Sequence, residues 1–143
     1  MCNSDQWYYQ TKGKKGNFDP EAISLLNELK PFNVEVVVSS TWGEDGVEQL
    51  KNVGLELPII GTTVHFHTEW FCRGNEIEKW LIDNFNRGTK FGGSNYFSER
   101  NYNYVIVDDD CDFLLGQKDN FVHVDRKTGI TKEDIEKIKK ILK

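Results

Sequence analysis

Apolar residues along this chain follow two patterns that alternate, one with helical spacing and one of short continuous runs. Segments with an apolar residue at every third or fourth position predict four helices, at 20–30, 44–52, 75–86 and 131–142. Runs rich in β-branched and aromatic residues predict strands between them, at 34–38, 57–60, 104–108 and 121–124. This alternation predicts an α/β fold, in which helices cover both faces of a mainly parallel sheet.

The first and last predicted helices have recognisable starts. Asp19 and Pro20 are typical of an N-cap followed by the first helical residue, and Pro31 closes that helix. Thr131 and Asp134 resemble a capping box at the start of the last helix, with Asp in place of the usual Glu.

The strand predicted at 104–108 runs directly into a cluster of carboxylates. Its last residue is Asp108, and Asp109, Asp110 and Asp112 follow within the next four positions. Ligands of open α/β sheets lie at the carboxyl ends of the strands, and crowded carboxylates there can hold a hard cation such as Mg²⁺. The alternative is an Asp-rich turn that only ends the strand.

Composition limits the class of protein without choosing a function. The 143 residues are enough for a single domain, 1–143, with a buried core. The net charge of −5 argues against nucleic-acid binding driven by charge alone, although not against an enzyme that grips a nucleic-acid end in one small site. The three cysteines are odd in number and lack C-x-x-C spacing, which favours a cytoplasmic setting. No run predicts a membrane span, so we expect no membrane partner.

Two further features lie, like the carboxylates, where predicted strands or helices end. Ser39, Ser40 and Thr41 follow the strand at 34–38, and their hydroxyls can donate to phosphate oxygens. Arg73 stands just before the third predicted helix, where a guanidinium and free backbone amides can share an anion. With the carboxylates, these residues supply the parts of a site for a phosphate and a cation.

Hydroxyl, Arg and Asp occur in the same chain order as motifs two, three and four of the haloacid-dehalogenase-like (HAD) phosphohydrolases. Four short motifs strengthen this resemblance: Phe18-Asp19-Pro20, Ser39-Ser40-Thr41-Trp42, Arg73-Gly74-Asn75-Glu76-Ile77 with Trp80-Leu81, and 104–110. In this order they resemble the HAD domain of Swiss Army Knife RNA-repair proteins, over nearly the whole chain. The resemblance implies a three-layer, HAD-like Rossmannoid fold with a minimal cap or none.

The resemblance also implies roles for individual residues. Ser39, or Ser40 if the register differs by one, would bind the transferring phosphoryl group together with Thr41. Arg73 would stabilise its charge, so Ser39 and Arg73 are the expected catalytic residues. The expected Mg²⁺ ligands are Asp108, Asp109 and Asp112. The substrate would be a phosphorylated small molecule, such as a nucleotide, or a nucleic-acid end.

The chain departs from the family at its start, because the first motif, Asp-x-Asp-Gly, does not occur in the sequence. In HAD phosphatases this motif follows the central strand, and it carries the nucleophile and the general acid and base. The resemblance therefore implies that the chain begins about ten residues late, roughly a strand and its loop. Either Met1 is an internal methionine and the N-terminus is truncated, or the nucleophile has been lost.

This departure leaves two functions open. The first is a HAD-type, Mg²⁺-dependent phosphomonoesterase that is inactive as written because its nucleophile is missing. The second is a catalytically inactive HAD-like module that binds a partner or a phosphorylated ligand. A weaker alternative makes Asp108 the nucleophile of a rearranged Asp-x-Asp motif, although Cys111 stands where glycine is expected.

The absence of the first, central strand also has a structural consequence. The strands at 34–38 and 104–108 would keep unpaired backbone groups inside the core. We expect one of three outcomes: the two strands close up, another segment inserts between them, or a second chain lends a strand, which would make a homodimer.

Overall fold

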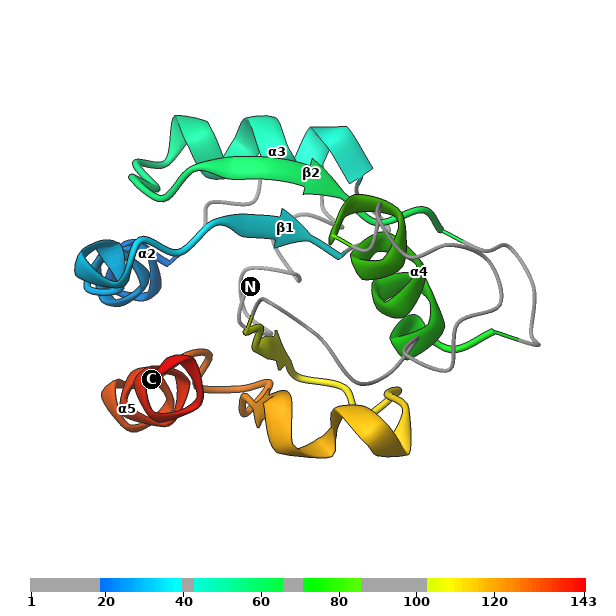
Figure 1. The fold of residues 1–143 in the computed structure, drawn as a ribbon. Coiled ribbons are helices and arrows are strands. Elements are labelled where there is room, and N and C mark those ends of the chain that lie inside the picture. Colours follow the sequence, from blue (N-terminus) through cyan, green and yellow to red (C-terminus); the bar gives the residue numbers. More distant parts are fainter. Residues whose placement is uncertain (1–18, 40–42, 66–70, 86–102) are drawn as a thin grey trace.

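The computed structural model describes residues 19–39, 43–65, 71–85 and 103–143 (Figure 1). Helices and strands alternate along these residues, and the expected α/β class is confirmed. Their bounds, in chain order, are α2 Pro20–Asn27, the 3-10 helix η1 Lys30–Phe32, β1 Val36–Val38, α3 Gly43–Asn52, β2 Ile59–Thr62, α4 Arg73–Phe85, β3 Ile106–Asp108, the 3-10 helix η2 Leu115–Asn120, β4 Phe121–His123 and α5 Lys132–Leu142.

The first and last helices begin where their capping residues predict. Asp19 Oδ1 accepts the backbone N–H of Glu21 at 3.0 Å, and Pro20 is the first residue of α2. At α5, the backbone N–H of Asp134 donates to Thr131 Oγ1 at 3.3 Å, and the backbone N–H of Thr131 donates to Asp134 Oδ2 at 2.9 Å. This reciprocal pair is a capping box, which confirms the pattern read from the sequence.

Two helix boundaries differ from the prediction, and one short helix was not predicted. α2 ends at Asn27, and Pro31 lies inside η1 rather than closing a longer helix. α4 starts at Arg73, so this arginine belongs to the first turn of the helix and does not precede it. The sequence pattern does not predict η2, because Leu115–Asn120 has no apolar residues at helical spacing.

The strands form two parallel pairs, β1 with β2 and β3 with β4. In the first pair Val38 lies opposite Thr62, and in the second pair Asp108 lies opposite His123. Among the described residues no strand joins the two pairs, and β1 does not pair with β3 (Figure 1). Direct closure of these two strands, one of the three expected outcomes, is therefore wrong.

Two clusters of buried aliphatic side chains hold helices against the strands. The larger joins α2, α5 and β4, and Ile135 and Ile138 at its centre are fully buried. The smaller joins α2, α3 and β1 through Ile23, Leu50 and Val38. α2 and α5 lie side by side, while β1 points towards α4 on the other side of the molecule (Figure 1). The carboxyl ends of the strands therefore meet the start of α4.

Candidate functional site

Residues from three elements meet at the carboxyl ends of β1 and β3. Arg73, the first residue of α4, donates through Nη1 to the backbone carbonyl of Ser39 at 2.8 Å. Its Nε lies 3.8 Å from Oδ2 of Asp108, the last residue of β3. The side chains of Arg73 and Asp108 are only 24% and 20% exposed, so the pair is partly shielded from water. The structure thus brings together the predicted Ser39, Arg73 and Asp108.

The segment that follows β3 holds the start of α4 in place. Asp112 Oδ2 accepts the backbone N–H of Arg73 at 3.1 Å, and the Asp112 carbonyl accepts the N–H of Gly74 at 3.0 Å. The buried Gln117 side chain donates through Nε2 to the Gly74 carbonyl at 3.0 Å. A Cβ on Gly74 would lie 2.6 Å from both Gln117 Oε1 and the backbone nitrogen of Leu114. Close packing around Gly74 therefore fixes Arg73 relative to the acidic segment.

Ser39 also contacts the end of β2. Thr63 Oγ1 donates to Ser39 Oγ at 3.3 Å, and the backbone N–H of Thr63 donates to the carbonyl of Val38 at 3.1 Å. Because Ser39 Oγ accepts this bond, its own proton is available for another acceptor, such as a phosphate oxygen. Ser40 and Thr41, the other predicted phosphate-binding residues, lie outside the described residues.

The adjacent carboxyl groups of Asp108 and Asp109 have pKa values shifted in opposite directions. Burial raises the pKa of Asp108, and the backbone N–H of Asp110, 3.0 Å from Asp108 Oδ1, together with Arg73 only partly offsets this. Burial also tends to raise the pKa of Asp109, but its hydrogen bonds with Asp108 and Arg126 outweigh this effect, so the pKa of Asp109 is lowered. Arg126 donates through Nε to Asp109 Oδ2 at 3.0 Å. Neighbouring carboxyl groups with such divergent pKa values favour a bound proton or cation between them.

The carboxylate oxygens of Asp108 and Asp109 are ligands of the type that Mg²⁺ prefers. Mg²⁺ in proteins is usually held by one or two carboxylates, while water and substrate phosphate complete its octahedral shell. Asp108 and Asp109 supply such a pair of carboxylates. Within the part of the chain that the structure describes, no group of three His, Cys, Asp or Glu side chains forms a cage for a metal. Asp112 caps α4 through its carboxylate, and its role as a third ligand stays a prediction.

Three further polar residues belong to this site although they were not predicted: Thr63, Arg126 and Gln117. Thr63 follows β2, and Arg126 lies just beyond β4. Polar residues that follow parallel strands share one edge of a sheet, so this rule would have found both. Gln117 has no such signal, because its role depends on the close approach of η2 to α4.

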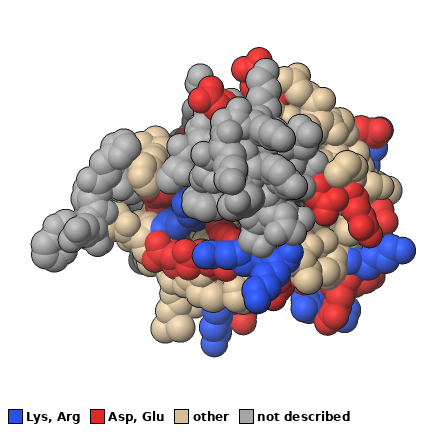
Figure 2. Space-filling view, turned by 180° about the vertical axis from the view of Figure 1, so that it is seen from behind, with Lys and Arg blue, Asp and Glu red and all other residues tan. Residues whose placement is uncertain are grey.

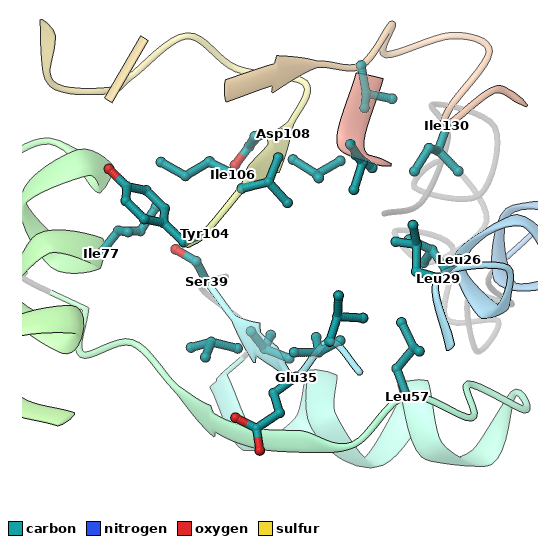
Figure 3. A pocket seen from close by; sticks show the side chains of 18 of the residues that line it. Leu26, Leu29, Glu35, Ser39, Leu57, Ile77, Tyr104, Ile106, Asp108 and Ile130 are labelled. Atoms are coloured by element: carbon teal, nitrogen blue, oxygen red, sulfur yellow. The ribbon is translucent and has the colours of Figure 1, made fainter. Parts of the chain in front are cut away.

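A pocket of about 690 Å³ lies between β1 and β3, with the site at one end (Figure 3). Ser39 and Asp108 face each other at the strand ends. Ile77 of α4 lies across the pocket from Leu26 of α2 and from Leu29, which follows that helix. The pocket is mostly aliphatic along the strands, while two arginines and several carboxylates line the end where the strands stop.

Positive and negative side chains are interspersed over the described part of the face in Figure 2. Among the described residues, several opposite charges are directly paired, such as Lys137 with Glu133 at 3.5 Å. The described residues of this face therefore offer no broad basic surface for a nucleic-acid backbone. In the described part of the chain, no helix combines the length and apolar character needed to cross a membrane.

Comparison with models of known protein families gives a match over most of the chain. A family model described as the HAD domain in Swiss Army Knife RNA repair proteins matches residues 1–135. None of the curated proteins or solved structures that were compared matches the chain. The family match spans Ser39, Arg73 and Asp108, and the parallel strand pairs agree with an α/β HAD-like fold. The chain therefore belongs to the family of HAD domains found in Swiss Army Knife RNA repair proteins.

Proposed function

We propose that this chain is the phosphate-binding and Mg²⁺-binding part of a HAD-type phosphomonoesterase that acts on phosphorylated RNA ends. The observation that carries the proposal is the position of Arg73 between the Ser39 carbonyl and the Asp108 carboxylate, with Asp109 beside them. The family supports hydrolase chemistry of the HAD type, and its description favours RNA as the phosphorylated substrate. Net charge and surface charge favour a grip on one terminal phosphate rather than on a long backbone.

Different residues of the site would bind different oxygens of one phosphate group. A guanidinium has five N–H donors in a planar fork, and those of Arg73 that do not hold Ser39 would bind phosphate oxygens. The Ser39 hydroxyl would donate to another oxygen of the same group. Asp108 and Asp109 would hold Mg²⁺. When bound there, Mg²⁺ would neutralise negative charge on the phosphate and on the leaving oxygen.

A second function is supported by a specific feature of the sequence. The Asp-x-Asp-Gly motif, which carries the nucleophile in HAD phosphatases, occurs nowhere in the 143 residues. A chain with the remaining phosphate-binding residues could bind a phosphorylated ligand without hydrolysing it. The alternative is therefore a HAD-like binding module.

The test measures binding and turnover separately on the full chain. Calorimetric titration with inorganic phosphate in the presence of Mg²⁺ reports binding, and phosphate release from a short 3′- or 5′-phosphorylated RNA reports hydrolysis. Arg73→Gln should weaken phosphate binding roughly ten- to hundredfold, because a hydrogen bond to a charged group contributes about 1.5–3 kcal/mol. Lys30→Gln is the matched control, because Lys30 is exposed and pairs with Glu56 away from the site.

Each outcome separates the functions. Phosphate binding with hydrolysis would support the phosphomonoesterase, and binding without hydrolysis would support the binding module. If the unmodified chain does not bind phosphate, or if Arg73→Gln binds as tightly as the unmodified chain, both functions are rejected.

A further inference from the structure

We propose that Arg126 is a positioning residue of the candidate Mg²⁺ site, where it holds the Asp109 carboxylate in the orientation that binds the cation. Arg126 lies just beyond β4, outside the four motifs that carry the family resemblance. This role rests on the proposed binding of Mg²⁺ by Asp108 and Asp109, and it assigns the residue that aims one of these two ligands.

The pairing of β3 with β4 brings Arg126 beside Asp109. The backbone N–H of Val124 donates to the carbonyl of Asp108 at 2.8 Å, so the residues that follow on both strands emerge side by side. Arg126 follows Val124 by two positions, and Asp109 directly follows Asp108. Arg126 donates through Nε to Asp109 Oδ2 at 3.0 Å. The contact therefore joins the carboxyl ends of two neighbouring strands.

The turn that carries Arg126 is closed by its own hydrogen bonds. Asp125 Oδ1 accepts the backbone N–H of Lys127 at 2.7 Å and that of Thr128 at 3.0 Å. The N–H of Gly129 donates to the Asp125 carbonyl at 2.9 Å, with a φ of 70° at the glycine, which this residue adopts without steric cost. These bonds fix the backbone of Arg126 relative to β4.

The side chain of Asp109 depends on Arg126 for a fixed direction. Its backbone is held separately, because His123 Nε2 lies 3.1 Å from the Asp109 carbonyl oxygen. The carboxylate itself is 38% exposed, and among the described residues Arg126 is the cation that pairs with it. Without this ion pair, the half-exposed side chain could rotate among its staggered rotamers and turn away from Asp108.

The contact with Arg126 is compatible with a bound cation. Arg126 uses Oδ2, whereas an ionised carboxylate has two oxygens with about four lone-pair sites between them. Carboxylates that bind metals commonly accept a hydrogen bond from a further residue, whose loss weakens metal binding about 10- to 100-fold. Asp108 has a similar neighbour, since Arg73 Nε lies 3.8 Å from its Oδ2. Each expected Mg²⁺ ligand therefore has a guanidinium beside it.

Charge and positioning predict opposite effects of removing Arg126. A guanidinium close to a bound cation repels it, so an effect of charge alone would make Arg126→Gln bind Mg²⁺ more tightly. Loss of the hydrogen bond that orients Asp109 would instead make Arg126→Gln bind Mg²⁺ more weakly. The direction of the change in affinity therefore distinguishes the two effects.

The experiment is a calorimetric titration of the full chain with Mg²⁺ in the absence of phosphate. Lys127→Gln is the matched control, because Lys127 is exposed at the next position of the same turn and carries the same charge. Three-bond couplings between Hα and Hβ of Asp109, measured by NMR without Mg²⁺, would report the rotamer of its side chain. Urea denaturation of both variants would show whether they are equally well folded.

We expect Arg126→Gln to bind Mg²⁺ at least about tenfold more weakly than the unmodified chain, and Lys127→Gln to bind it as tightly or slightly more tightly. The Asp109 couplings should indicate one rotamer in the unmodified chain and an average of rotamers in Arg126→Gln, while both variants unfold at the same urea concentration. Equal or tighter Mg²⁺ binding by Arg126→Gln would overturn the positioning role, as would an equal loss in Lys127→Gln.

Failure of the positioning role can be told apart from failure of the proposed function. Mg²⁺ binding by the unmodified chain that does not change in Arg126→Gln would overturn the role of Arg126 alone. If the unmodified chain binds no Mg²⁺, the Mg²⁺-binding part of the proposed function is rejected together with the role of Arg126.

Discussion

Gly74 is the point where the acidic segment and α4 approach most closely. In Gly74→Ala, the new Cβ would lie 2.6 Å from Gln117 Oε1 and from the backbone of Leu114, so one of these elements must move. We expect overpacking to lower the free energy of unfolding by about 1–3 kcal/mol, measured by urea denaturation. Phosphate binding should weaken as well, because α4 carries Arg73.

Gly116→Ala is the control for this substitution. Gly116 lies in η2, close in sequence to Gln117, but a Cβ there would have no atom within 4 Å. Its free energy of unfolding should change by less than about 0.5 kcal/mol. Equal losses in the two variants would contradict the close packing described for Gly74.

The ionised carboxylate of Asp108 should lower the free energy of unfolding at neutral pH, although the candidate site needs it. Because burial raises the pKa of Asp108, the folded chain keeps this carboxyl protonated to a higher pH than the unfolded chain does. The unfolded state then binds fewer protons, so stability is retained below the usual pKa of Asp and falls as the pH rises through the raised value. Asp108→Asn cannot ionise and should melt at a higher temperature than the unmodified chain at neutral pH.

Thermal melts across the acid range would check this expectation. The difference in melting temperature should shrink as the pH falls below the usual range for Asp, and titration should show that Asp108→Asn has lost Mg²⁺ binding. Asp45→Asn, on an exposed position of α3, controls for the loss of one negative charge and should keep Mg²⁺ binding. A lower melting temperature for Asp108→Asn at neutral pH would show that its pairing with Arg73 outweighs its burial.

Single residues of the site were predictable where they follow a strand. Ser39 follows β1 and Asp108 ends β3, and the rule for carboxyl edges of parallel strands brings them together. The sequence could not predict that Arg73 would reach the Ser39 backbone, since this contact depends on where α4 sits. It also could not predict Gln117, whose partners are more than forty positions away at Gly74 and three away at Leu114.

At the level of elements, the capping box of α5 makes a measurable contribution. Thr131 Oγ1 accepts the N–H of Asp134 and also donates to Asp134 Oδ2 at 2.8 Å. Thr131→Ala removes both interactions and should lower the free energy of unfolding by about 1 kcal/mol. Thr131→Ser keeps the hydroxyl and should stay within a few tenths of a kcal/mol of the unmodified chain. Similar losses in both variants would point to the lost methyl group instead of the cap.

Elements with strong local signals were the ones that the sequence predicted well. α5 begins directly after its N-cap residue Thr131, and its apolar residues include the fully buried Ile135 and Ile138. η2 was missed because a 3-10 helix this short is held by tertiary contacts of Gln117 and has little pattern of its own. The start of α4 was misplaced by two residues, because Asp112, distant in sequence, supplies the acceptors for its first N–H groups.

At the level of the whole molecule, the strands that the structure describes form two separate parallel pairs. The sequence predicted the strands of both pairs, and the absence of a central strand between them stays a prediction. The sequence alone could not predict whether β1 and β3 pair with each other. Pairing between distant strands depends on the packing of α2, α4 and α5 around them. The structure keeps β1 and β3 apart, with a pocket of about 690 Å³ between them.

The hydrogen bonds that join Asp112 and Gln117 to the first turn of α4 also limit how this family can vary. Asp112 holds two successive N–H groups of the helix, and Gln117 holds the next carbonyl, so the chain between Asp108 and Gln117 has a set length. An inserted or deleted residue there would move Asp112 or Gln117 away from its hydrogen-bond partners in α4. Many substitutions at exposed positions would leave these hydrogen bonds intact. Across evolution, this stretch should therefore change in composition much more readily than in length.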